Sequence, residues 1–385
     1  MKFSYKRAAI LYVLSAFLLC GCSNGKKETI SSDVQAVEAA AAEKISQAAT
    51  ESTETSGNAE EIQAAGESVS ESDQQESLDY VSFLFAGDVC LEEDGFVLDY
   101  YDETGGDLTQ CMSPYLLERM NAADIFMLNH EYCISDRGSR LDKYYTFRAA
   151  PSRMSILVQM GADIVSLANN HVYDYGYDAF EDTLCLLDEY GILHVGAGLN
   201  AEEAQKVQYF DLNGIKIGVI SASRAEKYVI TPEATDSQAG VFWMYDDTRL
   251  KEAAAEAAEQ CDYLIAYLHW GTEDSCYYED YQHDIAQELV DCGVDAIIGG
   301  HPHVVQGMEY IGDVPVFYSL GDFWFNGEDK YSMMVQLNIY KDGNTEVEII
   351  PCRQKNYCIY DIDTPEEQAD FFQYLSELSR GVVFK

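Results

Sequence analysis

From about residue 78 onward, short apolar runs alternate with segments whose apolar side chains recur every three or four residues. The short runs predict strands and the periodic segments predict amphipathic helices. In the segment 177–189, for example, Phe180, Leu184 and Leu187 fall on one helix face. The predicted strands are Val81–Ala86, Ile125–Leu128, Ile164–Leu167, Ile215–Ser221, Tyr263–Leu268 and Ala296–Ile298, and the predicted helices are Ser113–Asn121, Ser152–Met160, Tyr177–Glu189, Thr248–Gln260 and Asp280–Cys292.

Three further apolar runs follow without a helix between them, and they predict a closing set of antiparallel strands. These runs are Val314–Tyr318, Met333–Tyr340 and Thr345–Pro351, and a final helix is predicted over Pro365–Ser379. Alternating strands and helices followed by additional strands favour an α/β fold with two sheets and helices outside them. We expect residues 78–330 to form the main domain and residues 331–385 to complete it.

The N-terminal 22 residues have the pattern of a targeting segment. A positively charged start precedes the apolar stretch Ala8–Leu19, which is too short to favour a membrane span. The stretch ends in the sequence LCGC, which resembles a bacterial lipobox. We therefore predict a lipoprotein signal peptide over residues 1–22, with cleavage before Cys22 and lipid on its thiol. An ordinary signal peptide, or an uncleaved anchor, with an incidental cysteine is the alternative.

Residues 23–77 differ in composition from the rest of the chain. Ser, Thr, Ala, Glu and Gln dominate this segment, and it contains no aromatic residue. Such a segment cannot bury enough apolar surface to offset the entropy lost on ordering. We predict a disordered acidic linker that holds the domain off a membrane.

The formal net charge of -43 changes the range of partners to consider. So many negative charges repel nucleic acid, and we exclude DNA and RNA as ligands. The charge favours solubility outside the cell, and binding of divalent cations or cationic partners is the alternative. Of the 11 cysteines, nine remain without Cys20 and Cys22, so complete pairing within one chain is impossible. A local bond between Cys352 and Cys358 is the pairing that the spacing would allow.

Side chains that can bind metal follow six of the predicted strands. Ligands of α/β proteins bind beyond the carboxyl ends of the strands, so these side chains should converge in one crevice. A single Asp after a strand is usually a helix cap, and a single His is often a core residue, but five of the seven histidines lie at these strand ends. The set is Asp88, Asn129, His130, Glu131, Asn169, Asn170, His171, His269, His301, His303 and Asp322, and its mixture of nitrogen and oxygen ligands suits borderline divalent metals.

Eight segments between Val81 and Asn326 together resemble one protein family. They read FAGDV, NHE, YTFRAAP, SLANNHVYDYG, GILHVGAG, HWGTE, GGHPHVVQGMEY and FYSLGDFWFN. In this order they resemble the CapA family of capsule synthesis (poly-gamma-glutamate biosynthesis) proteins, which is similar to the calcineurin-like metallophosphatases. The resemblance implies a four-layer αββα sandwich of the metallophosphatase type.

The resemblance also implies roles for individual residues. The implied metal ligands are Asp88, Glu131, Asn170, His269, His301 and His303, around one or two divalent ions such as Mn, Fe, Zn or Mg. His171 would be a general acid, oriented by Asp174. Two residues depart from the pattern and are further candidate ligands: Cys90 replaces a metallophosphatase histidine, and Asp322 replaces the Asn that is common in the family.

Two regions are candidates for substrate binding. Arg148, in the segment TFRAAP, could clamp a carboxylate or phosphate, or it could form an ordinary surface salt bridge. Trp270, together with Tyr277, Tyr278 and Tyr281, could form a wall for an extended polymer, or these rings could be core residues.

Three functions remain open at this point. The first is a lipid-anchored protein on the extracellular face of the cell membrane that acts in capsule or poly-gamma-glutamate synthesis, export or attachment. Its partners would be an anionic polymer or small anionic substrate and membrane-bound subunits of a polymer synthase. The second is an extracellular metal-dependent hydrolase of phosphoesters or amides. The third is a non-catalytic assembly factor of a membrane polymer synthase.

Overall fold

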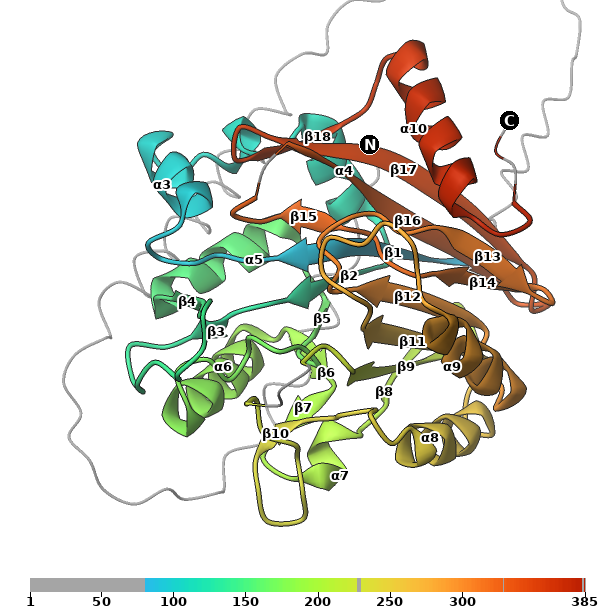
Figure 1. Ribbon diagram of the computed structural model, residues 1–385, viewed down its shortest axis with the longest axis horizontal. Coiled ribbons are helices and arrows are strands. Elements are labelled where there is room, and N and C mark those ends of the chain that lie inside the picture. Colours follow the sequence, from blue (N-terminus) through green and yellow to red (C-terminus); the bar gives the residue numbers. More distant parts are fainter. Residues whose placement is uncertain (1–79, 227–229, 328, 383, 385) are drawn as a thin grey trace, which may run out of the picture. The chain divides into compact units, whose positions relative to one another are not determined.

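The computed structural model describes residues 80–226, 230–327, 329–382 and 384. The predicted signal peptide, Cys22 and the predicted linker lie outside the described residues. Within the described residues, strands gather mainly into two large sheets, and helices lie on either side of them (Figure 1).

The first sheet has eight strands and contains both the earliest and the latest described strands of the chain. In spatial order its strands are β18 (Cys358–Asp361), β17 (Thr345–Lys355), β16 (Lys330–Tyr340), β1 (Tyr80–Val89), β2 (Ile125–His130), β5 (Ile164–Ser166) and β6 (Leu193–Val195), with β15 (Asp322–Trp324) beside β1. Strands β1, β2, β5 and β6 are parallel, whereas β16, β17 and β18 add to the sheet in antiparallel fashion.

The second sheet has six strands. In spatial order they are β13 (Met308–Ile311), β14 (Val314–Phe317), β12 (Ala296–Gly300), β11 (Tyr263–His269), β9 (Ile215–Ser223) and β8 (Gln208–Leu212). Two short pairs lie apart from the large sheets: β3 (Cys133–Ile134) with β4 (Arg148–Ala149), and β7 (Ala197–Gly198) with β10 (Gly240–Val241). The helices are α3 (Phe96–Glu103), α4 (Pro114–Ala122), α5 (Met154–Met160), α6 (Tyr177–Tyr190), α7 (Ala201–Ala204), α8 (Thr248–Ala258), α9 (Asp280–Asp291) and α10 (Pro365–Leu378), with short 3-10 turns at Leu108–Gln110 and Pro151–Arg153.

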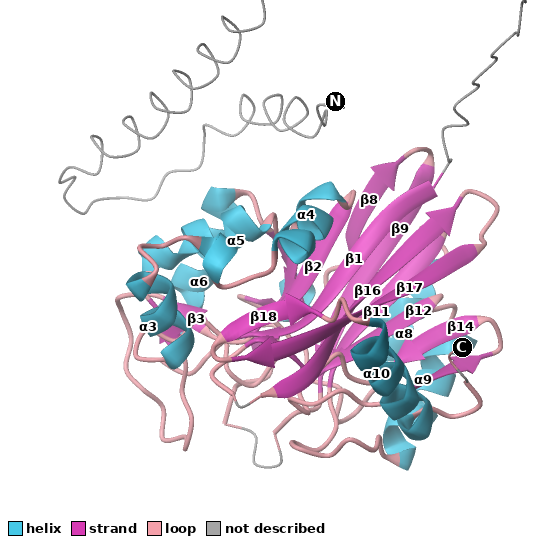
Figure 2. Ribbon diagram, turned by 90° about the horizontal axis from the view of Figure 1, so that it is seen from above, coloured by secondary structure: helices cyan, strands magenta, loops and turns pink. Residues whose placement is uncertain are grey.

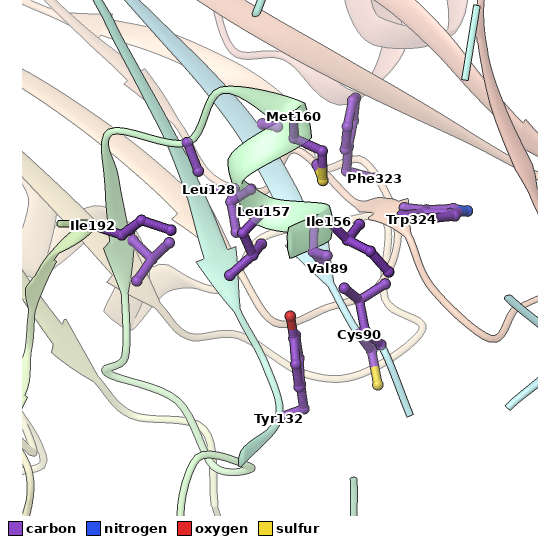
Figure 3. Packing of buried hydrophobic residues seen from close by; sticks show 14 of the residues in the cluster. Val89, Cys90, Leu128, Tyr132, Ile156, Leu157, Met160, Ile192, Phe323 and Trp324 are labelled. Carbon is purple, nitrogen blue, oxygen red and sulfur yellow. The ribbon is translucent and has the colours of Figure 1, made fainter. Parts of the chain in front are cut away.

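Three apolar clusters separate the layers. In β1, Leu84 packs in an outer cluster with α3 to α6, whereas Phe83 and Phe85 pack in a middle cluster with residues of the second sheet. A far cluster joins the other face of the second sheet to α8 and α9. Because both faces of each sheet are covered, β1 and β11 are apolar runs rather than alternating ones. Figure 2 shows the helices on opposite sides of the paired sheets, and Figure 3 shows part of the outer cluster. The predicted four-layer αββα sandwich is confirmed.

The C-terminal segment contributes to the same layers. Residues of β16 pair with β1 along most of its length, from Tyr80 opposite Tyr340 to Phe85 opposite Val335. Helix α10 inserts Phe371 and Leu375 into the middle cluster, and both side chains are fully buried. The strand at the start of the described chain therefore depends on a strand about 250 residues later, a long-range pairing that costs loop-closure entropy before it is stabilised.

Most elements predicted from the pattern are present, with ends that differ by a few residues. The prediction of a closing antiparallel run was wrong in one part, because β14 lies in the second sheet and runs parallel to β12. Its antiparallel partner is β13, which the pattern did not reveal. The suggested bond between Cys352 and Cys358 is absent, since both are free thiols among the described cysteines.

No helix among the described residues is long and apolar enough to cross a membrane.

Candidate metal centre

The carboxyl ends of strands from both sheets bring the candidate ligands together. Asp88, near the end of β1, aligns with Asn129 of β2 on one side and with Asp322 of β15 on the other. In the second sheet, His269 ends β11 and aligns with Gly300, which ends β12. The loop after β12 carries His301 and His303. Asp88, Asn129 and His269 are thus the last or nearly the last residues of their strands, rather than loop residues that follow them.

Two groups of side chains have the proximity that metal binding requires. Ligand atoms of Glu131, His269 and His301 all lie within 4.8 Å of one another, and the same holds for Asp88, Glu131 and His303. Glu131 belongs to both groups. This arrangement is what a pair of ions sharing one carboxylate would need, and it unites five of the six ligands implied by the family resemblance.

The sixth ligand, Asn170, lies beside the first group. Its Oδ1 is 2.9 Å from Nε2 of His269. The amide of Asn170 therefore faces the same space as the imidazole that is expected to bind metal with it.

The loop over the site is strained and closely packed. His301 and His303 have positive φ values of 99° and 58°, a region that non-glycine residues rarely occupy. The backbone N–H of His301 donates to Oδ2 of Asp88 at 3.0 Å. A Cβ on Gly300 would lie 2.5 Å from Oδ1 of Asp88, so only glycine lets the loop approach this carboxylate so closely.

Asn129 organises the site, a role that the pattern did not reveal. Its Nδ2 lies 2.8 Å from Oδ1 of Asp88, 3.0 Å from Oε2 of Glu131 and 3.2 Å from Nδ1 of His269. Its own Oδ1 accepts from Asn169 at 3.1 Å. The two N–H groups of this amide thus lie within reach of two carboxylates and one imidazole, and Asn169 fixes the amide in turn.

Burial shifts the pKa values of the charged groups at the site away from their usual range. Burial, with Glu131 nearby, raises the pKa of Asp88 to about 7, and burial also raises the pKa of Glu131 to about 7. Burial lowers the pKa of His269 to about 3 and that of His301 well below its usual range. Burial opposes the charged form of His303 as well, but Asp322, Glu131 and Asp88 together raise its pKa to about 10.

Two buried ligand atoms also lack hydrogen bonds. Within the described residues, neither Oε1 of Glu131 nor Nδ1 of His301 has a hydrogen-bond partner. Buried polar atoms are normally satisfied, and the binding of an ion is one standard explanation for an exception. Neutral imidazoles and buried carboxylates with free atoms are the donors that a divalent cation binds, so the residues present fit such an ion.

His171 stands at the edge of the site with its own support. Its Nδ1 is 2.7 Å from Oδ2 of Asp174, a fully buried carboxylate. Lys143 holds the other oxygen of Asp174 at 2.9 Å and also pairs with Glu226 at 2.7 Å. Lys143 and Glu226 were not predicted from the sequence, because a single Lys in a loop carries no pattern.

The remaining candidates divide between the site and the core. Asp322 lies 2.8 Å from Nδ1 of His303 and so supports that imidazole. Cys90 belongs to neither metal-binding group and is packed in the outer cluster (Figure 3). Burial there raises the pKa of its thiol well above the usual value, which favours the protonated form. His130 is also buried and belongs to neither group, and its ring stacks on that of Tyr132 with 3.8 Å between the ring centres.

The two residues proposed as substrate contacts, Trp270 and Arg148, make contacts within the protein. Trp270 is fully buried in the far cluster, and its indole donates to the carbonyl of Tyr318 at 3.0 Å. This burial favours the second of the two alternatives for Trp270, a core residue, over a substrate contact. The guanidinium of Arg148 lies 4.1 Å from the ring of Tyr175 and donates to the carbonyl of Arg137.

Comparison with known proteins places this site in context. The family model "Bacterial capsule synthesis protein PGA_cap" matches residues 82–327. The capsule biosynthesis protein CapA of Bacillus anthracis is 29% identical over 248 residues, which are 62% of this chain and 59% of that protein. The PGA biosynthesis protein CapA of Bacillus subtilis (strain 168) is 27% identical over 279 residues, 71% of each chain. The match therefore spans about three fifths of the Bacillus anthracis protein.

Solved structures are similar only at low identity. A hypothetical protein from Thermus thermophilus aligns with a TM-score of 0.42 and 16% identity, over 71% of this chain and 99% of that chain. A putative 5'-nucleotidase from Staphylococcus aureus, in complex with alpha-ketoglutarate, aligns with a TM-score of 0.42 and 15% identity, over 77% of this chain and 58% of that chain.

The metal-free protein should lose stability as the pH rises from 6.5 to 8.5. The raised pKa values of Asp88 and Glu131 mean that the folded protein holds protons that the unfolded chain has released, and this contribution is lost as the pH rises through about 7. The raised pKa of His303 acts in the same direction. In the presence of a chelator, we expect Tm to fall by about 5 °C over this range, measured by thermal unfolding.

Asp88→Asn should reduce this pH dependence, because the amide does not titrate, while Glu131 and His303 still contribute. A Tm of the chelated wild-type protein that rises between pH 6.5 and 8.5 would contradict the electrostatic description of the site.

Proposed function

Because this chain belongs to the bacterial capsule synthesis protein family described by the PGA_cap model, we propose that it acts in the synthesis, export or attachment of a capsule polymer such as poly-gamma-glutamate. The action would take place at a divalent metal centre. The observation that carries this proposal is the pair of buried ligand groups that share Glu131. The relatives named for capsule biosynthesis and PGA biosynthesis support the choice of polymer.

The ligand groups suggest how ions would be held. Glu131, His269 and His301, with Asn170 beside them, would hold one ion, and a second ion would lie between Asp88, Glu131 and His303. Mn, Fe, Zn and Mg are the candidate metals, since nitrogen and oxygen ligands of this kind accept each of them to a different degree. Such ions, when bound, polarise the bond under attack and lower the pKa of water.

The chain's own residues would manage the proton and the charge. His171, which is fixed by Asp174 and Lys143, is placed to give a proton to a leaving group. Cations at the centre would also reduce the repulsion between an anionic polymer and a protein whose formal net charge is -43.

A second candidate function uses the same site. The fixed contact between His171 and Asp174 favours chemistry over a purely structural metal. An extracellular metal-dependent hydrolase of amides or phosphoesters is therefore the alternative. A non-catalytic assembly factor would need the metal ligands but not His171, which makes this side chain the point at which the candidates differ.

The setting at the membrane is part of the proposal. A lipid on Cys22 and an acidic linker over residues 23–77 would place the domain on the extracellular face of the cell membrane. Membrane-bound subunits of a polymer synthase are the partners that this position and the family support.

Complementation of a strain lacking the gene would test the metal centre and the acid separately. We expect the wild-type gene to restore surface polymer, and His301→Ala and His171→Gln each to restore less than about a tenth of the wild-type amount. His301→Ala removes an expected metal ligand. His171→Gln removes the proton donor, whose loss typically costs about 100-fold or more in rate. Polymer would be quantified per cell, with protein levels checked by immunoblot. His283→Gln is the matched control, since His283 also pairs with a carboxylate, Glu309, outside the site.

Full restoration by His301→Ala would exclude a role of the metal in polymer production. Restoration by His171→Gln alone would favour the assembly factor over either chemical function.

Cys22→Ser should release the protein from the membrane. Without the thiol, the signal cannot be lipidated, and the apolar stretch Ala8–Leu19 is too short to favour a membrane span. Fractionation of cells should move the variant from the membrane to the medium, whereas Cys185→Ser, which alters an exposed thiol of the folded domain, should leave the distribution unchanged. Equal membrane retention of Cys22→Ser and wild type would refute the lipid anchor.

A further inference from the structure

A cavity of about 520 Å³ opens directly beside the proposed metal centre. His301 forms part of its wall, so a molecule in the cavity would touch a predicted metal ligand. The other side chains that matter here are Arg224, Tyr245, Tyr281 and Glu273. Of these four, the sequence pattern had singled out Tyr281 alone, as one of the aromatic residues that could line a polymer site.

The backbone fixes Arg224 relative to the metal centre. Arg224 follows the last residue of β9, and its N–H donates to the carbonyl of His269 at 2.8 Å. Because His269 is one of the expected ligands, the position of Arg224 is tied to the centre by one hydrogen bond. A substrate held by Arg224 would therefore keep a constant distance from the reacting position.

Two tyrosine rings hold the guanidinium of Arg224. The guanidinium carbon lies 4.3 Å from the ring centre of Tyr281 and 5.6 Å from that of Tyr245. Both rings are themselves fixed, since the hydroxyl of Tyr281 accepts from the N–H of Gly271 at 2.8 Å and the hydroxyl of Tyr245 donates to the carbonyl of Glu226. Stacking uses the face of the guanidinium and leaves its N–H edge available for a planar oxyanion.

The nearby carboxylates do not occupy this N–H edge. Within the described residues, no ion pair joins Arg224 to an acidic side chain. Glu226 is close to it in sequence, and Glu279 lines the same cavity, but both make other contacts. Glu226 pairs with Lys143 and accepts the N–H groups of Ile230 and Thr231. Glu279 caps α9 and accepts from Thr272.

We propose that Arg224 binds a free carboxylate of the polymer residue next to the one held at the metal centre. This inference rests on the proposed function and specifies its substrate contact. A gamma-linked glutamate chain carries one free carboxylate per residue, next to each amide, so a carboxylate anchor beside the ions would set which amide lies over them. Arg supplies two parallel N–H groups to a carboxylate, which fixes orientation as well as affinity.

Glu273 provides an internal test of the sign of the bound charge. It is exposed and lines the same cavity. If the ligand is an anion, the carboxylate of Glu273 repels it, and removing that charge should strengthen binding. If the cavity instead receives an amine, the same substitution should weaken binding.

The test is a binding measurement on the full-length protein in detergent. A pentamer of gamma-linked glutamate would be titrated by calorimetry, once with Mn²⁺ present and once with chelator. We expect Arg224→Gln to weaken binding about 10-fold or more, since a charge-assisted pair contributes on that order, and Arg224→Lys to weaken it less. Glu273→Gln should tighten binding about twofold to fivefold.

Arg380→Gln is the matched control, because its guanidinium also lies over a tyrosine, Tyr278, but outside the cavity. The Arg380→Gln variant should bind the pentamer with the affinity of wild type, and thermal unfolding would show that every variant is folded.

Equal affinity of Arg224→Gln and wild type would overturn this inference and leave the proposed function in place. Tighter binding of inorganic phosphate than of the pentamer, dependent on Arg224, would overturn the carboxylate assignment. If wild type does not bind the pentamer at all, both this inference and the proposed polymer function fail.

Discussion

The structure depends on the burial of two carboxylates, Asp88 and Glu131, at the place where the ends of two sheets meet. Both are fully excluded from solvent, and both face the imidazole of His269, which burial keeps neutral, and that of His303, whose pKa the surrounding carboxylates raise. Removing ionised carboxylates from water is costly unless a cation or strong hydrogen bonds compensate. Asn129 supplies part of that compensation, and one carboxylate oxygen of Glu131 is left without a hydrogen bond in the described structure. A divalent ion is the simplest group that satisfies what remains.

This constraint explains the arrangement around it. The sandwich places rigid strands from both sheets beneath the site, so Asp88 and His269 are held by β-ladders rather than by loops. The loop after β12 tolerates positive φ at two histidines because Gly300 lets it pack directly on Asp88. On one side, His171 has a buried network behind it; on the other, Arg224 has two fixed aromatic rings. Preorganised groups of this kind are expected where charge must be bound or moved.

The sequence predicted the strands, the helices and most of the expected ligands because their signals are local. Polar residues at the ends of buried apolar runs mark the carboxyl edge of a sheet, and the sandwich brings those edges together. Roles that depend on tertiary contacts were not found: Asn129 was included among the possible ligands but not as the amide that orients them, and Lys143 and Arg224 have no local pattern. The same limit applies to Trp270, because the choice between a substrate contact and a core residue is decided by tertiary packing and not by its neighbours in the chain. Strand β14 was assigned to the wrong run because its partner β13 is only four residues long.

The most direct test of the account is the metal content of the full-length protein, measured by elemental analysis after incubation with Mn, Fe, Zn or Mg and gel filtration. We predict that wild type retains one or two divalent ions per chain and that Glu131→Gln, which alters both groups, retains almost none. His194→Gln, which alters a histidine outside both groups, should match wild type. A wild-type protein that retains no divalent ion, or a Glu131→Gln variant that retains as much as wild type, would contradict the central claim.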